Sequence, residues 1–366
     1  MAPDERDGFV TELRTATARF LETEVSLDNL LAGERCSYRL WQQAAQMGWF
    51  RLVVPEEDAG FGLSIGQLGV VFAEVGKHLF PGPLLDHAVA LPWVISAASP
   101  AQRERLVPAL DGERVVALLD PATDAEPLRR CPGVQLNDGQ LDGQVQLVRS
   151  APVADELIVV ARDRTDDAVF LVERDREGIE VEAVSSMDPT TDYHTVMLRA
   201  VPVGEADLIG RDGEVASLSE LRASMRLMMA HELSGLTERM LQMSIEYAKV
   251  RHQFGRPIGS FQAIGHILAD MFVRVDSLRN LCAASAEDVS RDAELLVRTS
   301  IVAKSYAAAV GRSVAEGALQ VHGGIGFTME HPLHLFLKRA LALQGPYGDE
   351  RELHRELGRT LLAVGR

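Results

Sequence analysis

A basic turn, Arg251-His-Gln-Phe-Gly-Arg-Pro-Ile-Gly-Ser-Phe-Gln262, separates two long apolar-periodic segments in the last third of the chain. Before the turn, apolar residues recur at helical spacing from Leu221 to Tyr247. After it, the stripe from Phe261 to Cys282 alternates steps of three and four residues, which is typical of helix–helix packing. Helices of about 30 residues reach roughly 45 Å, so we expect the turn to project from a helical bundle.

The residues of this turn suit a phosphate-containing ligand. Arg251 offers a bidentate contact to a phosphate, and Phe254 offers an apolar ring next to Gln253 and Gly255. Backbone N–H groups in the first turn of the following helix point the same way. A dinucleotide pyrophosphate is bound by groups of this kind. A plain corner between two helices with a surface arginine has the same sequence features, so both interpretations stand at this point.

A second motif, Gln320-Val-His-Gly-Gly-Ile-Gly-Phe-Thr-Met-Glu-His-Pro332, follows another long helical pattern. Its glycines allow the backbone to approach another group closely, and they also suit the end of a helix. It is not a Rossmann fingerprint, because it follows a helix and not a strand. His322 and His331 flank the glycines without the clustered acidic or cysteine residues of a metal site, so no metal is expected.

Composition excludes several classes of function. The net charge of −16 argues against nucleic-acid binding and against an anionic membrane surface. No apolar run approaches the ~20 residues of a membrane span, and the charged N-terminus shows no signal peptide. Three cysteines without metal-like spacing, Cys36, Cys131 and Cys282, fit a reducing compartment. We therefore expect a cytoplasmic protein.

Three zones follow one another along the chain and predict an α+β fold. Residues 1–112 show helical periodicity, broken by a loop rich in Pro and Gly at Val53–Leu63. Residues 113–206 carry short β-rich runs such as Leu157-Ile-Val-Val160, bounded by turn signals, and are expected to form a β-domain. Residues 207–366 return to long helical patterns, as in a four-helix-type bundle.

Taken together and in this order, the two motifs closely resemble the FAD-contacting motifs in the C-terminal helical domain of acyl-CoA dehydrogenases. The resemblance covers nearly the whole chain. It implies FAD as cofactor, an acyl-CoA substrate and electron-transfer flavoprotein as electron acceptor. In the family, the glutamine and the second glycine of the later motif, here Gln320 and Gly324, touch the flavin of a neighbouring subunit. The residues implied to contact the cofactor are Arg251, Gln253, Phe254, Gln262, Gln320, Gly323 and Gly324.

Two departures from the family pattern matter. The first is in the β-domain, where the family usually carries a TEP-x-x-GSD loop that holds the flavin ring. This chain has Leu118-Leu-Asp-Pro-Ala-Thr-Asp-Ala-Glu-Pro127 there, without Gly-Ser-Asp. The resemblance therefore does not extend to the flavin bed that a subunit of the family builds in its own β-domain.

The second departure concerns the base. Acyl-CoA dehydrogenation needs a carboxylate to take the α-proton while a hydride moves to the flavin. Alignment on the family's last arginine, Arg339, places Gly348 opposite one of the two possible glutamates. Arg226 matches the arginine beside the other glutamate and is implied to contact substrate, but Met225 occupies the carboxylate position.

Asp349 and Glu350 lie one and two residues beyond the first position and are the candidates for a displaced base. The alternative is a structural role, in which Gly348-Asp-Glu350 begins the final helix, since acids favour a helix N-terminus.

The pattern resembles the glutamate-lacking subunit of actinobacterial heterotetrameric acyl-CoA dehydrogenases, some of which act on bulky sterol-side-chain thioesters. The first hypothesis is a subunit that completes a homologous partner's flavin site. Two alternatives stay open: a homotetrameric dehydrogenase that uses Asp349 or Glu350, and a non-redox protein on the same scaffold.

Overall fold

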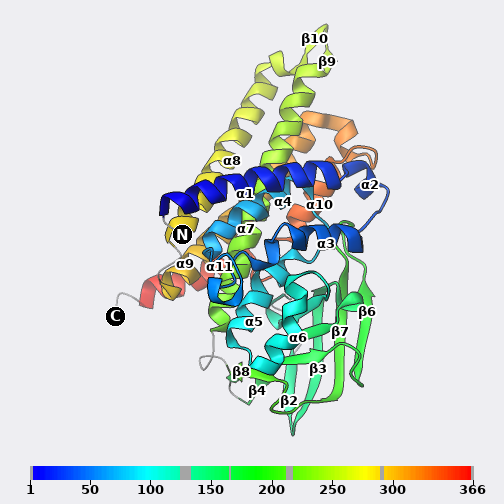
Figure 1. The fold of residues 1–366 in the computed structure, drawn as a ribbon. Helices are drawn as coiled ribbons and strands as arrows, with labels where there is room; N and C mark the ends of the chain where they lie inside the picture. The colour runs from blue at the N-terminus through cyan, green and yellow to red at the C-terminus, as the bar shows by residue number, and fades with distance from the viewer. Residues whose placement is uncertain (1–2, 124–132, 165, 212–216, 289–291, 364–366) are drawn as a thin grey trace.

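The structure, a computed structural model, describes residues 3–123, 133–164, 166–211, 217–288 and 292–363. Figure 1 shows a β-sheet at one end of the molecule and a long pair of helices, α7 and α8, that projects from the other end. The order along the chain is helices, sheet, helices, which confirms the predicted α+β organisation.

The first helical region packs around a core of large apolar side chains that includes Trp49, Phe50 and Phe72. Its α4 begins at a capping box: the Ser64 hydroxyl accepts a hydrogen bond from the Gln67 backbone, and Gln67 Oε1 accepts one from the Ser64 backbone. The helices are α1 (Pro3–Glu24), α2 (Leu27–Leu31), α3 (Tyr38–Gln46), α4 (Ile65–His78), α5 (Leu91–Ala97) and α6 (Pro100–Leu110).

Eight described strands form one mixed sheet in the order β6-β7-β3-β2-β4-β5-β8, with β1 parallel to β4. β2 is also parallel to β4, and the other pairs are antiparallel. The strands are β1 (Val116–Leu119), β2 (Val134–Asn137), β3 (Gln140–Arg149), β4 (Glu156–Asp163), β5 (Asp166–Glu173), β6 (Ile179–Val184), β7 (Tyr193–Pro202) and β8 (Leu208–Arg211).

A π-helical turn, η3 (Asp86–Ala90), ties the first helical region to the sheet. The Val116 backbone N–H donates to His87 Nε2 over 3.1 Å, and the Leu118 N–H donates to Asp86 Oδ2 over 3.3 Å. Both acceptors are buried. Strand β1 is therefore fixed to the helical region by side chains as well as by its pairing with β4.

The C-terminal region is a helical bundle around α7 (Leu218–Val250). Where α4 crosses α7, a Cβ on Gly235 would lie 1.8 Å from the Ala73 carbonyl oxygen, and one on Gly76 would lie 2.0 Å from the Glu232 oxygen. Only glycine permits this approach. The other helices are α8 (Gln262–Asp288), α9 (Ala293–His322), α10 (Leu333–Ala342) and α11 (Glu350–Ala363).

Helix α8 packs one face on α7 and α9. The later members of its predicted stripe, Met271, Val275, Leu278 and Cys282, are buried within the chain. The outer face of α8 is exposed and carries Phe272 and other apolar side chains. The earlier members, Phe261, Ile264 and Leu268, are only partly buried, so packing within the chain covers the later half of the predicted stripe.

Two short strands, β9 (His252–Gln253) and β10 (Arg256–Pro257), join α7 to α8 as a hairpin. The two residues between them, Phe254 and Gly255, have φ angles of 51° and 79°. Positive φ at both central residues is what a type I′ turn requires, and glycine supplies the second at no steric cost. The hairpin lies at the far end of the projecting helix pair in Figure 1.

Candidate functional site

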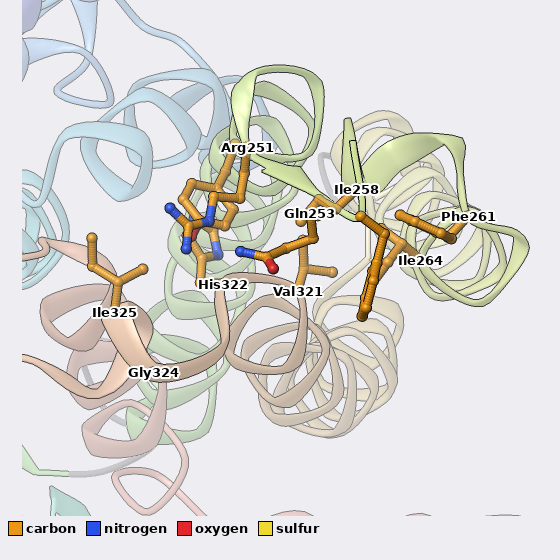
Figure 2. Close-up of a pocket in the computed structure, with 11 residues that line it drawn as sticks. Arg251, Gln253, Ile258, Phe261, Ile264, Val321, His322, Gly324 and Ile325 are labelled. Atoms are coloured by element: carbon orange, nitrogen blue, oxygen red, sulfur yellow. The ribbon is translucent and has the colours of Figure 1, made fainter. Parts of the chain in front are cut away.

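A pocket of about 550 Å³ lies at the base of this hairpin, between the end of α7, the start of α8 and the end of α9 (Figure 2). That volume falls in the range of small-molecule sites, roughly 300–1,000 Å³. The lining residues are Tyr247, Arg251, Gln253, Phe254, Ile258, Phe261, Ile264, Val321, His322, Gly324 and Ile325.

The two sequence motifs therefore meet in space. Four of the residues implied to contact FAD line this pocket: Arg251, Gln253, Phe254 and Gly324. The other three, Gln262, Gln320 and Gly323, lie in the same two motifs but outside the lining. Gln262 and Gln320 are exposed to solvent, so both side chains remain free to meet another molecule.

Arg251 lies at the end of α7, and both its backbone N–H and its carbonyl are hydrogen-bonded. Its N–H donates to the Tyr247 carbonyl over 2.9 Å, and its carbonyl accepts from the Ile258 N–H over 2.8 Å. The exposed guanidinium makes no hydrogen bond or ion pair to any described residue. A guanidinium with five free donors on a fixed backbone is prepared for a phosphate.

The glycines after α9, on the side of the pocket opposite Arg251, carry no side chains that would fill the space beside them. Gly323 ends the helix with φ 60°, and its N–H donates to the Leu319 carbonyl. A Cβ added at Gly323 or Gly324 would meet no atom within 4 Å. The space over these two backbones is therefore open to a ligand or to another subunit.

His322 is a pocket residue that the motif analysis did not assign. Its ring stacks on Tyr247 at 4.7 Å between centroids and lies 4.7 Å from the His331 ring. Its Nδ1 donates to the Ala318 carbonyl, and burial lowers the pKa of the imidazole, so the ring is neutral at pH 7. Only the run of aromatic and histidine residues hinted at this stack. No cluster of three or more potential metal ligands occurs within the described parts of the chain.

The place where the family carries its catalytic base is closed, unlike the open hairpin pocket. Tyr347 is buried there with φ 61°, and the cavity beside its ring has a volume of only about 20 Å³. That is room for about one water molecule. The cavity is enclosed by Leu85, Asp86, Leu118, Leu147, Arg149, Tyr193, Pro346 and Tyr347.

The segment that would form the chain's own flavin bed packs directly against this loop. The Tyr347 N–H donates to the Ala122 carbonyl over 2.8 Å. Asp120, fully buried, accepts hydrogen bonds of 2.9 and 2.8 Å from Arg222 of α7. Residues 124–132, which hold the rest of the aberrant loop, lie outside the described residues.

The candidate carboxylates have structural contacts. Asp349 Oδ1 accepts from the Glu352 N–H over 2.8 Å and so caps α11, which begins at Glu350 as the structural alternative predicted. Arg226 Nε donates to the Tyr347 carbonyl over 2.8 Å, and the same guanidinium pairs with Glu356 at 3.1 Å. Neither Asp349 nor Glu350 lines the small cavity.

Asp86 is the one carboxylate that encloses this cavity among the described residues, and sequence analysis did not single it out. Burial raises the pKa of Asp86 to about 6, against the lowering effects of Arg149 and of the Leu118 N–H. A perturbed acid often marks a site. Here the space beside it accepts neither a flavin ring nor a thioester.

The two locations therefore differ in their fit to FAD. The hairpin pocket supplies an unpaired guanidinium, an apolar wall and open glycine backbone, as the phosphate end of a dinucleotide requires. The closed cavity at Tyr347 supplies no room for an isoalloxazine ring. This fold and this pocket suit the class of flavin-dependent oxidoreductases with two helical domains around a β-sheet.

Comparison with known proteins agrees. The acyl-CoA dehydrogenase N-terminal domain model matches residues 10–113, and the C-terminal domain model matches residues 216–361. The chain is 32% identical to acyl-CoA dehydrogenase FadE27 of Mycobacterium tuberculosis over 357 residues, covering 93% of this chain and 92% of FadE27. The chain belongs to the acyl-CoA dehydrogenase family of oxidoreductases, and its cofactor is FAD.

Two solved structures of two-protein assemblies are similar to it. The ChsE4–ChsE5 complex of Mycobacterium tuberculosis contains a chain with a TM-score of 0.86 and 28% identity, covering 96% of this chain and 97% of that one. A variant of the Tcur3481–Tcur3483 steroid ACAD gives a TM-score of 0.83 and 27% identity, with coverage of 98% and 99%. Among the described helices, none is both long and apolar enough to cross a membrane.

Proposed function

We propose that this chain takes part in FAD-dependent α,β-desaturation of an acyl-CoA thioester by completing the flavin site of a homologous partner subunit. The observation that carries the proposal is the difference in volume between the hairpin pocket and the cavity beside Tyr347. About 550 Å³ lies open around Arg251, whereas about 20 Å³ remains beside Tyr347.

The proposed division of chemistry follows from the residues. Bound FAD supplies the hydride acceptor for the bond between the α and β carbons. The partner supplies the carboxylate that takes the α-proton, because Met225 and Gly348 occupy both expected positions here. Arg251 of this chain binds a phosphate of the partner's cofactor, Phe254 and Ile325 exclude water, and Gly324 allows close backbone approach.

The relatives support a two-protein assembly, since two of them were solved as complexes of two different chains. The proposed complex is a heterotetramer of two such pairs. We infer an acyl group of fatty-acid or sterol type, in line with the steroid substrate class named for one relative. Electron-transfer flavoprotein is the proposed electron acceptor.

The test is the flavin content of the complex. The chain is purified together with a homologue from the same genome that has the Gly-Ser-Asp loop and the catalytic glutamate. Arg251→Ala should release FAD from this complex while leaving its mass unchanged, because a charge-assisted phosphate contact is lost. Arg279→Ala is the control: Arg279 is an exposed arginine of α8 that pairs with Asp276 and does not line the pocket. Stoichiometric FAD in the Arg251→Ala complex would refute the assignment.

A further inference from the structure

A second pocket, of about 250 Å³, lies between the first helical region and the sheet. It shares no lining residue with the hairpin pocket. Its walls come from the loop before α3, the turn at Pro81–Pro83, the end of β3 and the start of β7. The lining residues are Cys36, Pro81, Gly82, Pro83, Arg149, Ser150, Pro152, Val153, Thr191, Asp192 and His194.

Arg149, at the end of β3, is the only residue that lines both this pocket and the closed cavity at Tyr347 among the described pockets. Its guanidinium lies loosely over the Tyr193 ring, at 5.9 Å from the centroid. No described carboxylate or carbonyl accepts a hydrogen bond from it. Five donors on a half-buried cation are thus without a protein acceptor, which is costly unless something else supplies one.

Two neutral donors converge on the same pocket. Ser150 directly follows Arg149, and Thr191 lines the same pocket from the segment before β7. Neither hydroxyl has a hydrogen-bond partner among the described residues. Guanidinium and hydroxyl groups together form the donor set that proteins use for carboxylates and phosphates.

Among the charged groups that line the pocket, Arg149 is the one that no described ion pair neutralises. Asp192 is the acid in the lining, and Arg35 pairs with it at 3.0 Å. Burial raises the pKa of the Cys36 thiol to about 12 and lowers the pKa of His194, so both are neutral at pH 7. Asp86, on the side of the closed cavity, and Glu232 both attract the Arg149 cation, so an added anion competes with these two carboxylates. The chain's net charge of −16 opposes an anion only weakly at this range, because salt screens charges beyond about 8–10 Å.

We propose that this pocket binds a small oxyanion, a carboxylate or a phosphate, through the Arg149 guanidinium with help from Ser150 and Thr191. The volume admits a phosphate or a short-chain carboxylate and is below the usual size of a site for a whole cofactor. The site is independent of the proposed flavin contact, since it needs no partner subunit and no FAD.

Binding is measured on the isolated full chain by thermal unfolding and calorimetry, with inorganic phosphate and butyrate as probes and sodium chloride at matched ionic strength as reference. We expect a saturable rise in Tm and a Kd on the order of 1 mM for at least one probe. The tighter probe identifies the source of the oxyanion. Arg149→Gln should weaken binding at least about tenfold, and Arg149→Lys, which keeps the charge but loses the bidentate fork, should fall between.

Arg199→Gln is the control, because Arg199 is an exposed arginine of β7 paired with Glu180. It should bind the probes as the unchanged chain does. No saturable effect of either probe beyond that of chloride would mean that water alone fills the pocket and would overturn the proposal. Equal binding by the chain and by Arg149→Gln would overturn it as well. Flavin retention by the complex is unaffected by either outcome, so this test and that of the proposed function fail separately.

Discussion

At the scale of single residues, Arg339 joins three parts of the molecule. From α10 it donates to Asp188 Oδ2 over 2.6 Å, to Glu232 Oε1 of α7 over 2.8 Å, and to the Thr190 hydroxyl over 2.6 Å. All four residues are buried. Burial alone would raise the pKa of Asp188, but Arg339 and Thr190 together hold it below its usual value.

Replacing Arg339 by Met should therefore strongly lower the free energy of unfolding. It leaves two buried carboxylates without their cation, a change that typically costs about 3–5 kcal/mol. Because the folded pKa of Asp188 is depressed, its contribution to stability is present above pH 3.8 and is lost as pH falls through the folded value. Urea unfolding at pH 7 measures the loss. Arg279→Met, which removes an exposed pair with Asp276, should cost at most about 1 kcal/mol. Similar losses for both variants would contradict the argument.

Lys304 gives a second prediction at this scale. Its amine is fully buried, donates to the Gln344 carbonyl over 3.0 Å, and has a pKa lowered to about 7, mainly by burial. The unfolded chain keeps its proton up to about pH 10.5, so stability should rise between pH 7 and 10.5, by at most about 1.4 kcal/mol per unit.

In Lys304→Met, this rise in the free energy of unfolding with pH should vanish, as measured by urea unfolding at pH 7, 8 and 9. The same substitution at the exposed Lys249 should leave the slope unchanged. An unaltered slope in Lys304→Met would show that the amine stays charged in the fold.

At the scale of elements, the start of α11 decides whether a base can be restored. Gly348 has φ 108°, and a Cβ there would lie 2.9 Å from Leu353 Cδ2. Gly348→Glu should therefore destabilise the chain by about 1–3 kcal/mol and restore no turnover. Gly358→Ala, within α11 and with open space around it, should instead stabilise by about 0.5–1 kcal/mol. A stable, active Gly348→Glu chain would refute the closed-site interpretation.

The cap of the same helix separates a structural acid from a catalytic one. Asp349→Asn keeps an N-cap side chain, whereas Asp349→Ala loses it and should cost about 1 kcal/mol of stability. Both variants should leave turnover of the assembled complex unchanged. Loss of turnover in Asp349→Asn at unchanged stability would identify Asp349 as a base. Thermal unfolding and an artificial electron acceptor provide the two measurements.

Elements with strong periodicity could be predicted from the sequence. The steps from Phe261 to Cys282 and the Phe254-Gly255 turn follow local rules of packing and backbone conformation. The closed cavity could not be predicted this way. Its walls come from η3, β3, β7 and the loop before α11, and no local pattern shows that Asp86, Arg149 and Tyr347 meet. The missing glutamate at Gly348 and the altered loop that begins at Leu118 were the sequence features that pointed to that place.

At the scale of the whole molecule, some of the exposed apolar side chains lie where the proposed partner would bind. Phe254 and Ile325 line the hairpin pocket and are exposed, with Phe254 at 92% of its full exposure, and Phe327 and Met329 are exposed within the glycine motif. Single exposed apolar residues are common, but a group beside an open pocket is typical of an interaction site. The end of the bundle far from the sheet in Figure 1 is thus the surface expected to meet the partner's flavin.

The flavin stoichiometry of the assembly tests this arrangement. If only the partner's bed holds a cofactor, the complex should contain one FAD for each pair of unlike chains, and this chain alone should be colourless. A homotetramer with intact sites would hold one FAD per chain. The isolated chain should also turn over acyl-CoA negligibly with an artificial acceptor, since a missing general base alone typically forfeits a factor of about 10²–10⁴. Absorbance at the flavin band against protein concentration, for the chain alone and for the complex, gives the ratio. A yellow isolated chain with one FAD each and robust turnover would show that the cavity at Tyr347 opens and that the chain is a complete dehydrogenase.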